Sequence, residues 1–147
     1  MKGGGKVQLN KTTDYAVRIV YFLSDENQIF TSEEISESTG VSRGYVISIL
    51  KRLSKAGLVE VIRGVKGGFR LKKKLDKISL FDVIKIMEGT ICINQCLDEE
   101  ENCNLHAIGQ CPVRKFYLSL QEQMESELRN MTFETLKKSG GGGRIFG

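Results

Sequence analysis

Apolar residues recur at intervals of three and four positions near the start of the chain, and this spacing predicts an amphipathic helix. The stripe consists of Tyr15, Ala16, Ile19, Val20 and Leu23. The pattern stops in the polar run 24–27. Thr31 and Glu34 then have the spacing of a capping box, in which each side chain accepts a hydrogen bond from a backbone N–H group at a helix start. We therefore expect a second, short helix that ends at about Ser38.

Gly40 and Ser42 separate this second helix from a third. Gly40 favours a helix end, and Ser42 is suited to cap the next helix start. The apolar positions of the third helix are Val46, Ile49, Leu50 and Leu53, and the helix is expected to close at Gly57. Two helices joined by a short turn with glycine are typical of a helix-turn-helix unit, whose second helix can enter the major groove of DNA.

A short hairpin is predicted directly after the third helix. Residues 58–62 have the pattern of a strand, 63–68 of a turn and 69–71 of the return strand. Three glycines in the turn allow the backbone to reverse tightly. A hairpin in this place is a wing, and its cations Arg63, Lys66 and Arg70 can reach phosphates or a narrow minor groove.

The second half of the chain predicts two further helices around a stretch without periodicity. Ser79 and Asp82 open a fourth helix, which is stopped at Gly89. Residues 90–110 lack a regular pattern, and Pro112 fits the first turn of a last helix. The stripe of that helix consists of Val113, Phe116, Tyr117, Leu120, Met124, Leu128 and Met131. A stripe of this length needs a partner, and pairing with a second copy in a homodimer is the favoured interpretation.

The predicted fold is therefore mainly α with a small β wing. A winged helix-turn-helix domain spans residues 7–75. A connecting helix and a cysteine loop follow over 76–111. A long C-terminal dimerisation helix covers 112–138, and a glycine-rich, flexible tail covers 139–147.

The length and composition of the chain fit one compact domain. It has 147 residues, of which 40% are hydrophobic, and it contains no apolar run long enough to cross a bilayer. Residues 1–6 lack the apolar stretch of a secretory signal, so a cytoplasmic location is expected. The net charge of +4 is modest, but residues 42–74 hold ten Lys or Arg residues against the single acid Glu60. This asymmetry favours DNA as a partner.

All four cysteines lie within one short segment. Cys92, Cys96, Cys103 and Cys111 are separated by three, six and seven residues. In a reducing compartment such a cluster favours metal binding or redox chemistry over structural disulfides. The spacing leaves an iron-sulfur cluster, zinc and thiol chemistry open. A single histidine and scattered serines offer no nucleophile with a base, so an enzyme is not expected.

Five segments carry a resemblance to a known family of regulators. They are Leu9-Asn-Lys-Thr-Thr-Asp-Tyr-Ala-Val-Arg18, Ser42-Arg-Gly-Tyr-Val46, Leu53-Ser-Lys-Ala-Gly-Leu-Val59, Arg63-Gly-Val-Lys-Gly-Gly-Phe-Arg-Leu71 and residues 78–89. With these segments the chain resembles the winged-helix regulators that include the iron-sulfur regulator IscR, the nitric-oxide sensor NsrR and the cysteine-metabolism repressor CymR. The similarity covers residues 7–135 and is highly specific.

The resemblance implies an iron-sulfur cluster with three cysteine ligands. They fall on Cys96, Cys103 and Cys111, with spacings wider than is usual in that family, so Cys92 stands as a substitute or a fourth ligand. Asp14 matches a carboxylate that nitric-oxide-sensing relatives supply from the partner subunit; its alternative role is a helix N-cap. His106 resembles the ligand of some two-iron members. A 4Fe-4S cluster is favoured over 2Fe-2S.

The same resemblance implies how DNA is read. Ser42, Arg43 and Tyr45 at the start of the third helix are expected to contact bases, and Arg63 and Lys66 on the wing to contact the backbone. The function that follows is a regulator that binds double-stranded operator DNA as a homodimer and senses redox state, nitric oxide or iron-sulfur status. A winged-helix regulator with structural zinc and an electron-transfer protein are the alternatives.

Overall fold

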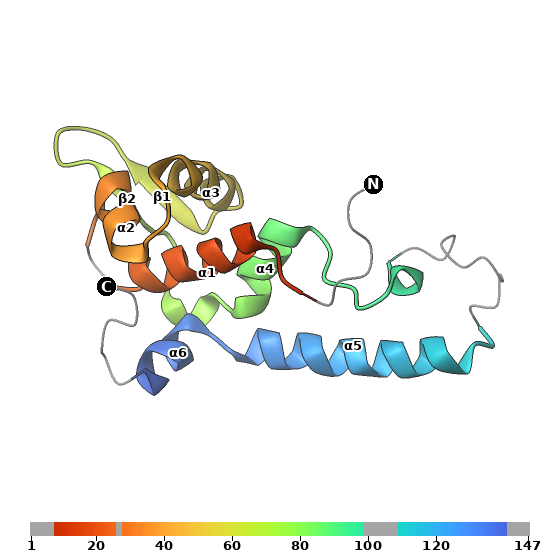
Figure 1. Ribbon diagram of the computed structural model, residues 1–147. Coiled ribbons are helices and arrows are strands. Elements are labelled where there is room, and N and C mark those ends of the chain that lie inside the picture. The colour runs from red at the N-terminus through yellow and green to blue at the C-terminus, as the bar shows by residue number, and fades with distance from the viewer. Residues whose placement is uncertain (1–7, 26–27, 99–108, 141–147) are drawn as a thin grey trace.

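Helices and a two-stranded hairpin form the winged fold that the sequence predicts (Figure 1). In this computed structural model residues 8–25, 28–98 and 109–140 are described. The elements of the domain are α1 (Lys11–Leu23), α2 (Ser32–Thr39), α3 (Arg43–Lys55), β1 (Val59–Ile62), β2 (Gly68–Leu71), the 3-10 turn η1 (Leu75–Lys77) and α4 (Leu80–Glu88). They are followed by η2 (Gln95–Leu97), α5 (Pro112–Asn130) and α6 (Phe133–Ser139). The predicted fold class is confirmed.

Side-chain caps fix where most of the helices begin. The capping boxes predicted at the starts of α2 and α4 are both present. At α1, however, the cap is Asn10, whose side chain accepts a hydrogen bond from the backbone N–H of Thr12 at 3.3 Å. The interpretation of Asp14 as that N-cap is therefore wrong. Ser42 occupies the N-cap position of α3, but its side chain makes no capping hydrogen bond.

The core of the domain lies where α1, α2, α3 and α4 meet the hairpin. The predicted stripes supply its side chains, with Tyr15 only half-buried at its edge. The fully buried residues include Ala16, Ile19, Val20, Ile35, Val46, Ile49, Leu50, Leu53, Ile78 and Val83. The face of α3 that bears Ser42, Arg43 and Tyr45 is consequently turned outward.

The hairpin is joined to the rest of the domain through Phe30. Strands β1 and β2 pair antiparallel with Val59 opposite Leu71, and Phe30 bridges Phe69 through backbone hydrogen bonds of 3.0 and 2.8 Å. A Cβ atom at Gly68 would lie 2.5 Å from the carbonyl oxygen of Phe30, so this glycine is required for close backbone approach. The predicted wing is present.

The predicted single helix over 112–138 is wrong at its C-terminal end. Helix α5 ends at Asn130, and the side chain of Thr132 caps the separate helix α6. Phe133 is fully buried in the core of the winged domain, and its backbone N–H donates to the carbonyl oxygen of Ile78 at 2.9 Å. Burying this aromatic ring and pairing the backbone outweigh one more turn of helix. The predicted tail begins inside α6, which ends at Ser139.

Candidate DNA-binding surface and cysteine loop

The exposed start of α3 carries the three residues predicted to read bases. Ser42, Arg43 and Tyr45 are all exposed, while Val46 on the next position is fully buried. Burial of one face therefore fixes the orientation of the opposite one. An exposed helix start of this kind suits the geometry in which a recognition helix enters the major groove.

Arg43 is held by two residues of α2. Its Nη1 atom lies 3.1 Å from Oε1 of Glu33, and its Nε–H donates to Oγ of Ser32 at 3.3 Å. Sequence reasoning missed both partners, because the turn between α2 and α3 brings together side chains ten or more residues apart. These two contacts set the direction of the Arg43 guanidinium on the exposed surface of α3.

Tyr45 contacts Tyr15, the first member of a short series of side-chain contacts along α1. Its ring lies edge-on to that of Tyr15 with centroids 5.8 Å apart. The guanidinium of Arg18 lies over the Tyr15 ring at 5.4 Å and forms an ion pair of 2.9 Å with Asp14. Lys11 also interacts with Tyr15. The Tyr15 hydroxyl raises the pKa of Lys11, mainly through a hydrogen bond and to a smaller extent through charge interaction. Asp14 and Tyr45 are therefore linked through two intervening side chains.

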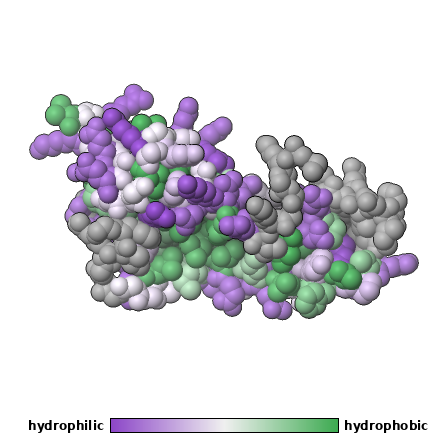
Figure 2. Space-filling view, viewed as in Figure 1, coloured by the Kyte–Doolittle hydropathy of each residue, from purple (hydrophilic) through white to green (hydrophobic). Residues whose placement is uncertain are grey.

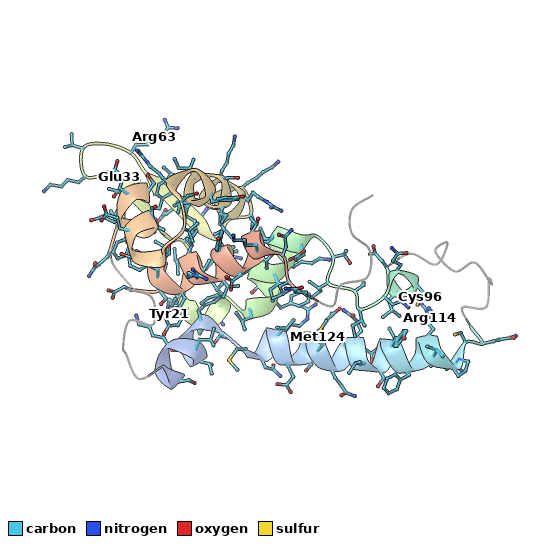
Figure 3. The ribbon with its side chains drawn as sticks, viewed as in Figure 1. Tyr21, Glu33, Arg63, Cys96, Arg114 and Met124 are labelled. Carbon is cyan, nitrogen blue, oxygen red and sulfur yellow. The ribbon has the colours of Figure 1, made fainter. Side chains whose placement is uncertain are left out.

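The wing carries exposed cations beside α3. Arg63 and Lys66, which the sequence predicts to contact the DNA backbone, are exposed at the end of the hairpin. Arg70, in contrast, is paired with Glu60 directly across the strands. Figure 2 shows hydrophilic residues gathered over the wing and α3. Figure 3 shows Arg63 and Glu33 at this end of the molecule and Cys96 at the other.

Three of the predicted thiols lie in or beside the loop between α4 and α5. Cys92, Cys96 and Cys111 are half-buried, and none forms a disulfide. Cys103 and His106 lie outside the described residues. Among residues 8–25, 28–98 and 109–140, no three side chains of His, Cys, Asp or Glu come together closely enough to hold a metal ion. The thiols have the donor chemistry that an iron-sulfur cluster needs, but a complete ligand set is not assembled by these residues alone.

Gln121 of α5 clamps the loop around Cys92. This side chain is only 4% exposed. Its Oε1 atom accepts a hydrogen bond from the backbone N–H of Ile93 at 2.8 Å, and its Nε2 atom donates to the carbonyl oxygen of Ile91 at 2.9 Å. The amide thus pairs with the backbone on both sides of Cys92 and fixes the position of that thiol.

Arg114 of α5 holds the other two described thiols. Its Nε–H donates to the carbonyl oxygen of Cys96 at 3.2 Å, and its backbone N–H donates to Sγ of Cys111 at 3.4 Å. Cys111 is itself the N-cap of α5. Figure 3 shows Cys96 beside Arg114 at the start of α5. No local pattern could have indicated that Arg114 binds Cys96 or that Gln121 binds Ile91, because these partners are 18 and 30 residues away in the sequence.

The end of α4, which leads into the cysteine loop, is bound to both α3 and α1. Nη2 of Arg52 on α3 donates to the carbonyl oxygens of Ile86 and Met87 at 3.1 and 2.8 Å. Oε1 of Glu88 accepts hydrogen bonds from the backbone N–H of Asn10 at 2.8 Å and from the hydroxyl of Thr13 at 2.6 Å. Two residues separate Glu88 from Ile91, the first point of the loop that Gln121 binds.

Comparison with known proteins decides the family. A family model described as Rrf2, iron-dependent transcriptional regulator, matches residues 9–139. The chain belongs to the Rrf2 family of transcriptional regulators. It is 34% identical over 123 residues to Protein aau3 of Rhizobium meliloti, which covers 78% of this chain and 80% of that protein. Rrf2 proteins bind DNA, are typically dimeric and are not enzymes.

Solved structures confirm the winged-helix fold. IscR of T. potens superposes with a TM-score of 0.71 at 21% identity, covering 94% of this chain and 91% of that one. CymR, the global cysteine regulator of B. subtilis, gives a TM-score of 0.69 at 24% identity, covering 90% and 97%. In the part of this Rrf2 chain that the structure describes, no helix is long and apolar enough to cross a membrane.

Proposed function

We propose that this Rrf2 protein binds operator DNA as a homodimer and that an iron-sulfur cluster in its cysteine loop alters its affinity for that DNA. One observation carries the proposal. The last residues of α4 are bound by Arg52 of the recognition helix, and only a few residues later the chain enters the loop that bears the thiols. A change in this loop therefore acts on a segment that is bonded directly to α3.

The proposed ligands are Cys96, Cys103 and Cys111. The description of the family as iron-dependent supports iron over zinc at these thiols. Cys92 is the substitute ligand, and His106 is the alternative within the loop. When bound, such a cluster supplies irons that respond to oxidants and to small molecules such as nitric oxide, and 4Fe-4S is the form we favour. Gln121 binds the backbone beside Cys92 to α5, and Arg114 binds the backbone of Cys96 to the same helix.

A fourth ligand is proposed from Asp14 of a second copy. Its carboxylate is 61% exposed on α1, so it is accessible to a neighbouring molecule. It is also the end of the contact series through Arg18 and Tyr15 to Tyr45. If Asp14 leaves Arg18 to bind iron, the support of a base-reading side chain changes. The cluster would then affect α3 through α1 as well as through α4.

The second copy is proposed to pair along α5. Val113, Phe116 and Leu120 form one apolar stripe on this helix and are 53%, 65% and 42% exposed. Gln121, on another face of α5, is buried against the cysteine loop of its own chain. The helix therefore has one face for its own protomer and one left for a partner, which suits a two-fold dimer on a two-fold DNA site.

Anaerobic purification tests the cluster assignment. The expected product is coloured, absorbs visible light and contains iron. Cys103→Ser should abolish that absorption, whereas Cys92→Ser should leave most of it. A colourless protein with stoichiometric zinc would contradict the cluster, and absorption that survives Cys103→Ser would contradict the ligand set.

A further inference from the structure

The ion pair between Glu33 and Arg43 occupies the point where the recognition helix would meet DNA. Glu33 lies in the first turn of α2 and Arg43 is the first residue of α3. Their side chains are 65% and 60% exposed. An ion pair this exposed contributes little to the stability of the fold, so its effect is to be sought where Arg43 works.

We propose that Glu33 is a specificity-determining residue, which makes Arg43 discriminate between guanine edges and phosphates. This inference rests on the proposed base-reading role of Arg43. Two nitrogens of the guanidinium are engaged by Glu33 and Ser32, so the direction of the group is set before DNA arrives. A pre-oriented fork loses less entropy when it makes a bidentate contact in the major groove.

The charge of Glu33 acts differently on the two classes of DNA contact. A phosphate carries a full negative charge and is repelled by a carboxylate a few ångströms away, whereas the N7 and O6 atoms of guanine are neutral acceptors. Glu33 therefore weakens non-specific contacts of Arg43 with the backbone more than it weakens a contact with guanine. Glu33 therefore lowers the affinity of the protein for DNA of random sequence and raises the ratio of specific to non-specific affinity.

Neutralising the Glu33 carboxylate should reduce the discrimination between specific and non-specific DNA. With Glu33→Gln, we expect the affinity for non-specific DNA to rise about threefold to tenfold, which is the effect of removing one nearby charge in an aqueous interface. The slope of log affinity against log salt should steepen by about one, because one more phosphate contact becomes available. Affinity for the preferred sequence should change by less than about twofold, since the amide oxygen that replaces the carboxylate can still accept a hydrogen bond from Arg43 and keep its orientation.

The test uses the full-length protein and two fluorescent duplexes. One is enriched from a random library against the wild type, and the other is a scramble of the same length and composition. Anisotropy titrations over a series of salt concentrations give both affinities and both slopes. The matched control is Glu37→Gln, the same charge change at an exposed position one turn further along α2. The control should shift both duplexes equally.

Three further outcomes separate this inference from the proposed function. If Glu33→Gln shifts both duplexes by the same factor, as the control does, the inference is overturned. If Arg43→Ala leaves affinity for the enriched duplex unchanged, the base-reading role of Arg43 itself fails. In the Arg43→Ala background, Glu33→Gln should lose its effect on the affinity ratio; an undiminished effect would show that Glu33 acts without Arg43.

Discussion

The clamp formed by Gln121 leads to a prediction that the structure makes quantitative. Gln121→Leu keeps the approximate volume of the side chain but removes both hydrogen bonds to the loop backbone. Each neutral hydrogen bond contributes about 1 kcal/mol, and a buried backbone group left without a partner costs about 1–3 kcal/mol. Since part of the loop can regain hydrogen bonds to water, we expect the free energy that holds the loop on α5 to fall by about 2–4 kcal/mol.

Amide hydrogen exchange at Ile93 measures this loss directly. In the wild type the N–H of Ile93 is protected by Oε1 of Gln121. A loss of about 2 kcal/mol corresponds to roughly 30-fold faster exchange when opening is local. If the loop and the fold open together, the melting temperature falls as well, by about 2–4 °C for each kcal/mol. Both quantities are accessible in the same sample by NMR and by thermal unfolding.

The matched control for this variant lies two residues away. Gln123→Leu makes the same substitution on the same helix, at an exposed position. It should leave the exchange of Ile93 unchanged, since Gln123 makes no described contact with the loop. Exchange rates of Ile93 that agree within twofold between Gln121→Leu and the wild type would refute the clamp. Equal acceleration in both variants would show a general loosening of α5 instead.

Three other substitutions test separate parts of the structure. Gly68→Ala places a Cβ atom against the carbonyl oxygen of Phe30, and it should lower the free energy of unfolding by about 1–3 kcal/mol in denaturant titrations. Arg52→Ala removes two charge-assisted hydrogen bonds to the end of α4 and should cost about 1–3 kcal/mol, with faster amide exchange in the last turn of α4. Phe116→Glu introduces a charge into the exposed stripe of α5 and should weaken self-association about 100-fold in analytical ultracentrifugation.

Each of these three substitutions is compared with a control substitution. Gly109→Ala adds a Cβ atom that meets no atom of the described residues within 4 Å, and it should be close to neutral; a similar loss there would remove the argument from close approach. Lys51→Ala lies beside Arg52 and should change stability by less than about 0.5 kcal/mol. Lys115→Glu changes charge next to Phe116 but off the stripe, and a dimer that is weakened equally by both substitutions would contradict a seam along that stripe.

Local signals explain how far the sequence predicted the fold. The stripe from Ala16 to Leu23 and the capping boxes at Thr31 and Ser79 depend on residues within one or two turns, so they were predictable. The break at Met131 was not, because it results from pairing between residues that are about fifty positions apart and from the burial of Phe133. The predicted apolar stripe runs up to Met131 and gave no sign of this break.

Local patterns in the sequence likewise predicted only part of the candidate site. Exposed cations on α3 and the wing follow from the helix-turn-helix pattern, and all of the predicted DNA-contact residues lie on that surface. The groups that restrain them do not follow from any local pattern. Glu33 meets Arg43 only across the turn, and Gln121 looks in the sequence like one more polar residue on an amphipathic helix. Metal ligation by Cys96, Cys103, Cys111 and Asp14, with Cys92 as substitute, stays a prediction.

The most direct test of the central claim is DNA affinity measured on one preparation in two states. The dissociation constant of the enriched duplex is determined anaerobically with the cluster intact and again after its removal. We expect at least a fivefold difference between the two states, within the usual range of coupling between two sites, and we expect that difference to vanish in Cys96→Ser. Equal affinity in both states of the wild type would contradict the account of this protein as a cluster-controlled regulator.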